Sequence, residues 1–107
     1  MIEQPEKVIF RVDKKKAYDR VYYYAVFPES EDSTNGLLSC LPFYEDTGYG
    51  TVDGFRFECY GTMNMNYYYN ETKPVHKNSE LANRLMNVLQ KYYPQYSFRV
   101  AEKIVYK

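Results

Sequence analysis

The chain has 107 residues, of which 45% are hydrophobic and 26% are charged, and its formal net charge is zero. This length predicts one domain, residues 1–107, with a single modest core. No apolar run approaches the roughly 20 residues of a membrane span, and the first residues lack the pattern of a signal peptide. We therefore expect a cytoplasmic protein that has no membrane partner.

Alternation of apolar and polar residues predicts several strands in the first half of the chain. These strands lie at 7–13, 18–27, 37–41 and 55–62. The second of them is partly apolar on both faces, which indicates a central strand. The last places Phe55, Phe57 and Cys59 toward the core. Residues 42–52 contain one proline and two glycines, and we expect a long loop there.

One amphipathic helix is predicted after Pro74, with Asn78 or Ser79 as its N-cap. Its apolar face has helical spacing and consists of Leu81, Leu85, Val88, Leu89 and Tyr92. Pro94 ends the helix, and alternation at 96–106 predicts a closing strand. Residues 63–71 either extend the preceding strand or form a separate arm.

These elements define an α+β fold. It has one antiparallel sheet of about four to five strands and a single helix on one face, in the order β-β-β-β-α-β. A helix of about 14 residues is about 21 Å long and covers only one face of such a sheet. The opposite face is then solvated, covered by residues 41–52 and 63–74, or used as an interface.

Fourteen residues are tyrosine, and eight of these stand in the runs 22–24, 67–69 and 92–93. Tyrosine joins a large apolar ring to a polar tip and favours half-buried strand positions. Neighbouring side chains of a strand point to opposite faces, so a tyrosine run places rings on both sides of a sheet. One side can be core, and the other is then a surface available for contact.

Residues with catalytic or metal-binding chemistry are few. His76 is the only histidine, and no metal-ligand spacing links it to Cys40 or Cys59. Both thiols are expected to be reduced, and Cys59 to be buried and inert. The carboxylate pairs at 31–32 and 45–46 lie in polar loops, where nothing would raise a pKa. We expect no enzyme activity, no catalytic residues, no metal and no cofactor.

The charges are separated along the chain. Residues 1–27 carry six basic and four acidic groups (+2), residues 28–72 one and eight (−7), and residues 73–107 seven and two (+5). In a small folded domain these segments lie within about a Debye length and can neutralise one another. Alternatively, the middle segment forms an acidic face for a basic partner.

Several short motifs occur at a recognisable spacing. They are Phe10-Arg11, Ala25-Val26-Phe27-Pro28-Glu29, Cys40 with Tyr44 and Gly48, and Thr72-Lys73-Pro74 before a helix with Glu80, Leu85 and Leu89. With them, residues 8–106 resemble a family of small uncharacterised proteins from bacterial mobile elements and phages. The HVGQH segment of that family is replaced here by residues 44–50, so no role of its histidines carries over. The resemblance implies an accessory protein of a mobile element.

The hypothesis that follows is a non-enzymatic protein that binds another protein or a second copy of itself, as in a homodimer. Tyrosine is enriched at interface hot spots because it buries a large area at low entropic cost. The residues expected to make the contact are Tyr22, Tyr24, Tyr44, Tyr49, Tyr60, Tyr67, Tyr68 and Tyr69.

The alternative is binding of single-stranded nucleic acid or RNA, with bases stacked on exposed tyrosines along a basic groove. Residues 14–16 with Arg99, Lys103 and Lys107 could supply the basic charge. The sequence pI of about 6.6 makes this the less favoured hypothesis, because phosphate contacts require a basic footprint.

Overall fold

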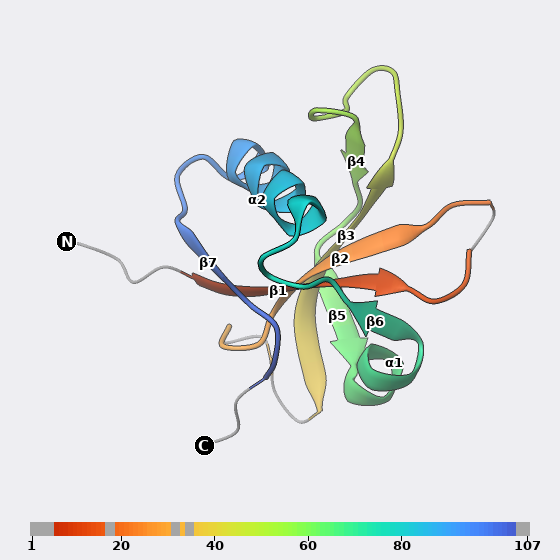
Figure 1. Ribbon diagram of the computed structural model, residues 1–107, viewed down its shortest axis with the longest axis vertical. Coiled ribbons are helices and arrows are strands. Elements are labelled where there is room, and N and C mark those ends of the chain that lie inside the picture. The colour runs from red at the N-terminus through yellow and green to blue at the C-terminus, as the bar shows by residue number, and fades with distance from the viewer. Residues whose placement is uncertain (1–5, 17–18, 31–32, 34–35, 105–107) are drawn as a thin grey trace.

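The computed structural model describes residues 6–16, 19–30, 33 and 36–104, and within these ranges seven strands form one sheet flanked by two helices (Figure 1). The strands are β1 (Glu6–Asp13), β2 (Tyr22–Phe27), β3 (Leu37–Glu45), β4 (Phe55–Phe57), β5 (Gly61–Asn64), β6 (Thr72–Pro74) and β7 (Phe98–Ala101). The helices are α1 (Met65–Asn70) and α2 (Glu80–Tyr92). The predicted α+β class is confirmed.

The sheet is mixed. Its main order is β4-β3-β2-β1-β6, while β5 pairs with β3 and β7 pairs with β1. β7 runs parallel to β1, whereas β6 pairs with the other end of β1 in the antiparallel sense. The predicted antiparallel sheet of four to five strands with one helix is therefore a coarser description than the observed mixed sheet of seven strands with two helices. The difference arises because α2 carries the chain back to the start of β1 before β7 begins.

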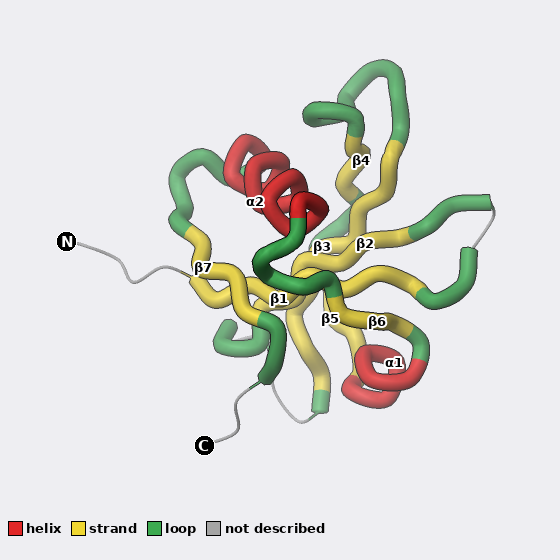
Figure 2. The backbone as a smooth tube through the Cα atoms, viewed as in Figure 1, coloured by secondary structure: helices red, strands yellow, loops and turns green. Residues whose placement is uncertain are grey.

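The two faces of the sheet have separate cores. The first core lies under α2 and joins Val8, Phe10, Ala25, Leu41, Phe43 and Phe55 to Ala82, Leu85, Val88 and Leu89 of the helix. The second lies on the opposite face and consists of Ile9, Val26, Leu38, Cys40, Met63 and Tyr68. Of the three expectations for this face, coverage by residues 41–52 and 63–74 is confirmed in part, because α1 and β5 supply Tyr68 and Met63 whereas residues 41–52 supply none of this core. Figure 2 shows the two helices well apart, α2 near β7 and α1 beside β6.

The strand predicted at 55–62 is interrupted. Phe57 lies opposite Phe43, and Gly61 lies opposite Cys40, so the three residues 58–60 face the two residues 41–42. This is the residue count of a β-bulge. One extra residue reverses the side toward which every later side chain points.

The bulge corrects one sequence prediction. Cys59, which the alternation placed in the core, is exposed. Tyr60 takes the α2 side instead, and its ring stacks on Phe27 at 6.2 Å between centroids. Met63 consequently points into the second core.

Local hydrogen bonds define where both helices begin. Ser79 is the N-cap of α2, because its Oγ accepts the Ala82 amide hydrogen at 3.1 Å. Asn64 caps α1 in the same way through the amide of Tyr67, at 2.7 Å. α1 has only six residues, so its stability depends on the packing of Tyr68 in the second core.

Several strand boundaries differ from the predictions. β2 begins at Tyr22, after a turn in which Asp19 has a φ of +62°. β3 continues past Pro42 to Glu45, so the following loop begins at residue 46. This proline is tolerated because it lies opposite the bulge, where the ladder is already interrupted. β7 is shorter than predicted, and residues 18, 105 and 106 of the predicted strands lie outside the described ranges.

Candidate functional site

The structure divides the eight predicted contact tyrosines among four places. Tyr22, Tyr24, Tyr44 and Tyr67 form one cluster on the face opposite α2, with ring centroids 5.3–6.4 Å apart. Next to it lie the adjacent rings of Tyr68 and Tyr69, of which Tyr68 is buried in the second core and Tyr69 is exposed. Tyr49 projects from the 46–54 loop and is 99% exposed. Tyr60 belongs to the α2 side.

The cluster of Tyr22, Tyr24, Tyr44 and Tyr67 is held by contacts within the fold. The hydroxyls of Tyr24 and Tyr67 donate to the two carboxylate oxygens of Asp13, at 3.1 and 2.9 Å. Tyr44 is buried, and the guanidinium of Arg20 lies 4.4 Å from the centre of its ring. A buried Tyr44 offers little contact area, which corrects the expectation of an exposed residue.

Asp13 is the acidic residue that the tyrosine hydroxyls of this cluster contact. Burial raises the pKa of the Asp13 carboxyl, and the hydroxyls of Tyr67 and Tyr24 partly offset that rise. Burial also raises the pKa of Tyr24 and of Tyr67. The two hydroxyls therefore remain protonated and available as donors to Asp13. This arrangement stabilises the end of β1 and leaves few polar groups for an external partner.

A second buried polar group, Arg11 of β1, forms hydrogen bonds to α1 and β6. Its Nε donates to Thr72 Oγ1 at 2.9 Å, and its Nη2 donates to the carbonyls of Tyr68 and Thr72 at 2.8 and 2.9 Å. The guanidinium also lies 4.2 Å from the centre of the Tyr68 ring. Tyr68 thus has a structural position, and its near-complete burial corrects the expectation that it meets a partner.

A concave surface with an aromatic lining lies on the α2 side. It is a pocket of about 390 Å³ lined by Glu6, Phe27, Ser30, Tyr60, Tyr93, Tyr96 and Phe98. We call it the aromatic pocket. Its residues come from the start of β1, the end of β2, the bulge, the segment after α2, and β7. The fold therefore assembles it from positions that are far apart in the sequence.

The rings of the aromatic pocket contact one another. Phe98 lies 6.1–6.5 Å from Phe27, Tyr93 and Tyr96, and Tyr60 stacks on Phe27. Phe27 is only 5% exposed and forms the floor, whereas Tyr60 and Tyr96 are 45% and 49% exposed and form the rim. An apolar floor with amphipathic rings at its edge is typical of binding sites.

Hydrogen bonds hold the wall of the pocket in place. The Gln90 side-chain amide donates to the carbonyls of both Tyr93 and Tyr96. The Tyr96 amide donates to the Tyr93 carbonyl at 3.2 Å, and the Glu6 amide donates to the Ser97 carbonyl at 2.9 Å. The two rings are therefore oriented before any partner arrives, which lowers the entropic cost of binding.

Glu6 is the acidic residue of the pocket lining. Burial, and then the nearby charge of Glu29, raise the pKa of the Glu6 carboxyl. The neighbouring cations Lys7 and Arg99 both pair with Glu29, at 3.7 and 3.9 Å. None of the ion pairs in the described ranges includes Glu6. Burial also raises the pKa of Tyr93, with further contributions from the neighbouring tyrosines.

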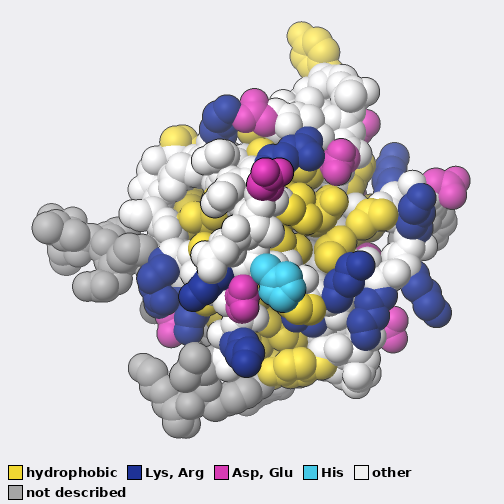
Figure 3. Space-filling model, in the orientation of Figure 1, with side chains coloured by type: hydrophobic (Ala, Val, Ile, Leu, Met, Phe, Trp, Pro, Cys, Tyr) yellow, Lys and Arg dark blue, Asp and Glu magenta, His cyan; other side chains and the backbone are white. Residues whose placement is uncertain are grey.

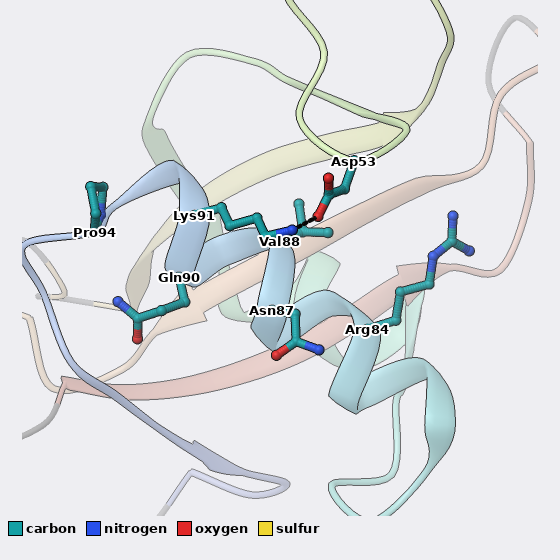
Figure 4. Close-up of a pocket in the computed structure, with 7 residues that line it drawn as sticks. All are labelled: Asp53, Arg84, Asn87, Val88, Gln90, Lys91 and Pro94. Carbon is teal, nitrogen blue, oxygen red and sulfur yellow. Dashed lines mark hydrogen bonds and ion pairs between the residues drawn. The ribbon is translucent and has the colours of Figure 1, made fainter.

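A larger hollow of about 860 Å³ lies along the outer side of α2 (Figure 4). It is lined by Asp53, Arg84, Asn87, Val88, Gln90, Lys91 and Pro94. Figure 4 shows Lys91 reaching across to Asp53, with which it forms an ion pair. Arg84 lies over the Phe55 ring, 4.7 Å from its centre, and 3.9 Å from Glu45. These charges already have partners in the fold, and the lining has no aromatic ring.

In the part of the chain that the structure describes, His76 and Glu102 line a pocket of about 370 Å³ together with Arg11, Tyr69 and Lys103. No three His, Cys, Asp or Glu side chains there are placed to hold a metal ion. The Cys40 thiol is buried, and burial raises its pKa to about 11, which keeps it protonated and unreactive near neutral pH. His76 is exposed, 3.7 Å from Glu102.

The segments of unlike charge meet in the folded chain. Within the described ranges, four ion pairs connect the acidic middle segment to the basic flanking segments; they are Lys7–Glu29, Arg99–Glu29, Arg84–Glu45 and Lys91–Asp53. Figure 3 shows basic and acidic side chains interspersed over the face in view. Of the two interpretations of the charge pattern, mutual neutralisation is the one these contacts favour.

Comparison of the chain with protein-family models, with curated proteins and with solved structures gave no match. The resemblance to mobile-element proteins therefore stays a prediction. Neither helix of the described chain has the length and apolar character needed to cross a membrane.

Sequence reasoning missed most of the aromatic pocket. Of the eight predicted tyrosines only Tyr60 lines it, and Glu6, Tyr93 and Phe98 were not predicted as contact residues. A usable signal was present in the 92–93 run followed by Pro94 and Tyr96. Tyrosines beside a helix stop are not confined to the helix core, and they can face a neighbouring strand.

Proposed function

We propose that this protein is a non-enzymatic binding module that uses the aromatic pocket to recognise another protein. The observation that carries the proposal is the combination of a buried Phe27 floor with the half-exposed rings of Tyr60 and Tyr96 at the rim. Such rings bury a large area when a partner side chain enters, and they lose little conformational entropy.

The proposed contact surface is on the α2 side of the sheet, whereas most of the tyrosines predicted from the sequence lie on the opposite face. On the opposite face the hydroxyls of Tyr24 and Tyr67 are bonded to Asp13, and Tyr22 donates to Glu58 at 3.3 Å. In the aromatic pocket, by contrast, the rings of Tyr60 and Tyr96 are about half exposed. Tyr49 and Tyr69 are exposed but lie outside the pocket, which makes them suitable controls.

The proposed biological setting is that of an accessory protein of a mobile element, and it supports the choice of a protein partner. Self-association is a different outcome of the same surface, since a second copy could present its own side chain to the pocket. Single-stranded nucleic acid is less favoured, because the sequence pI is only about 6.6 and Arg99, one of the cations expected in a basic groove, pairs with Glu29.

Affinity capture from the native host lysate tests the proposal. The tagged wild-type chain should recover a specific protein, with and without nuclease treatment. The double variant Tyr60→Ser with Tyr96→Ser should lose that protein, whereas Tyr49→Ser should keep it. Circular dichroism must show that all three chains are folded.

Two results would contradict the proposal. Recovery that is unchanged in the double variant would remove the aromatic pocket from the contact. Recovery that disappears with nuclease would favour nucleic-acid binding. Sedimentation of the purified chain identifies self-association, because a dimer that dissociates in the double variant would make a second copy the partner.

A further inference from the structure

The aromatic pocket combines two features that together select the charge of a ligand. The first is the set of five aromatic side chains that line it, from Phe27, Tyr60, Tyr93, Tyr96 and Phe98. The face of an aromatic ring carries a partial negative charge and attracts a cation placed over it, most strongly where water is excluded. Rings of several orientations, with interplanar angles from 28° to 87°, can present faces to one bound group.

The second feature is Glu6, which lines the pocket and whose carboxylate has no ion-pair partner among the described residues. Both nearby cations, Lys7 and Arg99, are engaged with Glu29 rather than with Glu6. A carboxylate left without a cation in a partly desolvated pocket is a site that a ligand cation can satisfy.

We infer that the aromatic pocket accepts an alkylammonium group, as on a lysine side chain of the partner, with or without N-methylation. This inference rests on the proposed function and specifies the chemistry of the partner. The alkyl part would lie on Phe27 and Phe98, and the cationic head would lie among the tyrosine rings with Glu6 at its side. A volume of about 390 Å³ accommodates such a group together with water.

The competing possibilities have a poorer fit to the same residues. An anion would meet Glu6 and the negative faces of the rings. A neutral apolar side chain would gain the floor contacts but would leave the Glu6 carboxylate without a partner in a desolvated site, which is unfavourable. Charge therefore discriminates among ligands of the same shape.

Choline and its neutral isostere 3,3-dimethylbutan-1-ol form the test, because they differ in charge and hardly in shape. Each is titrated into the full chain labelled with ¹⁵N, and the backbone amide shifts of Tyr93, Tyr96 and Phe98 are followed. A cation–π gain of about 1–2 kcal/mol corresponds to roughly fivefold to thirtyfold tighter binding of choline. n-Butylammonium and n-butyltrimethylammonium in separate titrations distinguish unmethylated from methylated lysine.

Glu6→Gln separates the carboxylate from the rings. It keeps the shape of the side chain and should weaken choline binding several-fold, while leaving the isostere unaffected. Glu58→Gln, on the opposite face beside Tyr22, is the matched control and should leave both affinities unchanged.

Equal affinity of choline and its isostere would overturn the inference. So would the absence of a saturable amide shift with all three cations. Neither result touches the proposed function, which fails if partner capture is insensitive to Tyr60 and Tyr96 or disappears with nuclease. Conversely, choline binding that depends on Glu6 supports the inference even where the lysate yields no partner.

Discussion

Replacement of Arg11 by lysine should destabilise the fold although the charge is kept. The Arg11 side chain is 7% exposed, makes three hydrogen bonds to Tyr68 and Thr72, and lies against the Tyr68 ring. A lysine ammonium has one nitrogen, so it cannot reach Thr72 Oγ1 and both carbonyls as the planar guanidinium does, nor can it stack flat on the ring. The packing of α1 and β6 on β1 is weakened as a result.

The expected cost follows from these contacts. A hydrogen bond to a charged group contributes about 1.5–3 kcal/mol, and a desolvated cation–π contact about 2 kcal/mol. If lysine keeps the carbonyl contacts and loses one hydrogen bond and part of the stacking, the free energy of unfolding should fall by about 3 kcal/mol. This is a large fraction of the roughly 5–15 kcal/mol that stabilises a domain.

Urea unfolding followed by far-ultraviolet circular dichroism measures the change. Arg99→Lys is the control, since Arg99 is exposed and has one ion pair at 3.9 Å; it should change stability by less than about 0.5 kcal/mol. Thr72→Val completes a double-mutant cycle with Arg11→Lys, and the two costs should not add, because both variants break the Arg11–Thr72 contact. An unchanged midpoint in Arg11→Lys, or strict additivity in the cycle, would refute the role given to the guanidinium.

Three further predictions concern other parts of the fold. Ser79→Ala removes the N-cap of α2 and should cost about 1 kcal/mol in urea unfolding, with Ser79→Gly milder; no loss would contradict the cap. Burial raises the pKa of Asp13 in the folded state. The wild type should therefore gain stability relative to Asp13→Asn as the pH falls from 7 through that pKa, and a gain in stability as the pH rises would contradict this prediction. A thiol reagent should label exposed Cys59 quickly and buried Cys40 only after unfolding; equal rates would contradict the assigned burial.

The elements that sequence reasoning placed well are those specified by local signals. α2 was expected because its apolar residues recur at helical spacing between a capping serine, Ser79, and Pro94. β1 and β2 were expected because alternation continues over most of each strand. In these segments the period of the side chains and the nearest capping or breaking residue are sufficient.

The elements that sequence reasoning missed depend on contacts between distant segments. α1 is too short to be stable alone. It forms because the Tyr68 side chain packs into the second core and Arg11 donates a hydrogen bond to the Tyr68 carbonyl. The parallel pairing of β7 with β1 depends on the path of the chain after α2. Neither feature has a pattern of its own in the sequence.

The position of the candidate site also depends on contacts between distant segments. The exchange of Cys59 for Tyr60 on the α2 side follows from one extra residue at 58–60, and alternation alone could not reveal it. Glu6 reaches the aromatic pocket because β1 and β7 are in a register that sets it beside Phe98. A tyrosine count therefore predicts an aromatic surface but does not locate it.

Ring contacts connect the aromatic pocket to the main core. A continuous series of contacts runs from Phe43 through Phe57, Tyr92 and Tyr93 to Phe98, with successive centroids 4.1–6.4 Å apart. Close-packed interiors transmit small displacements, so the position of the Tyr93 ring depends on the packing of β3 and β4. The same contacts that stabilise the sheet thereby orient the Tyr93 and Phe98 rings of the pocket, whose wall is an extension of the core.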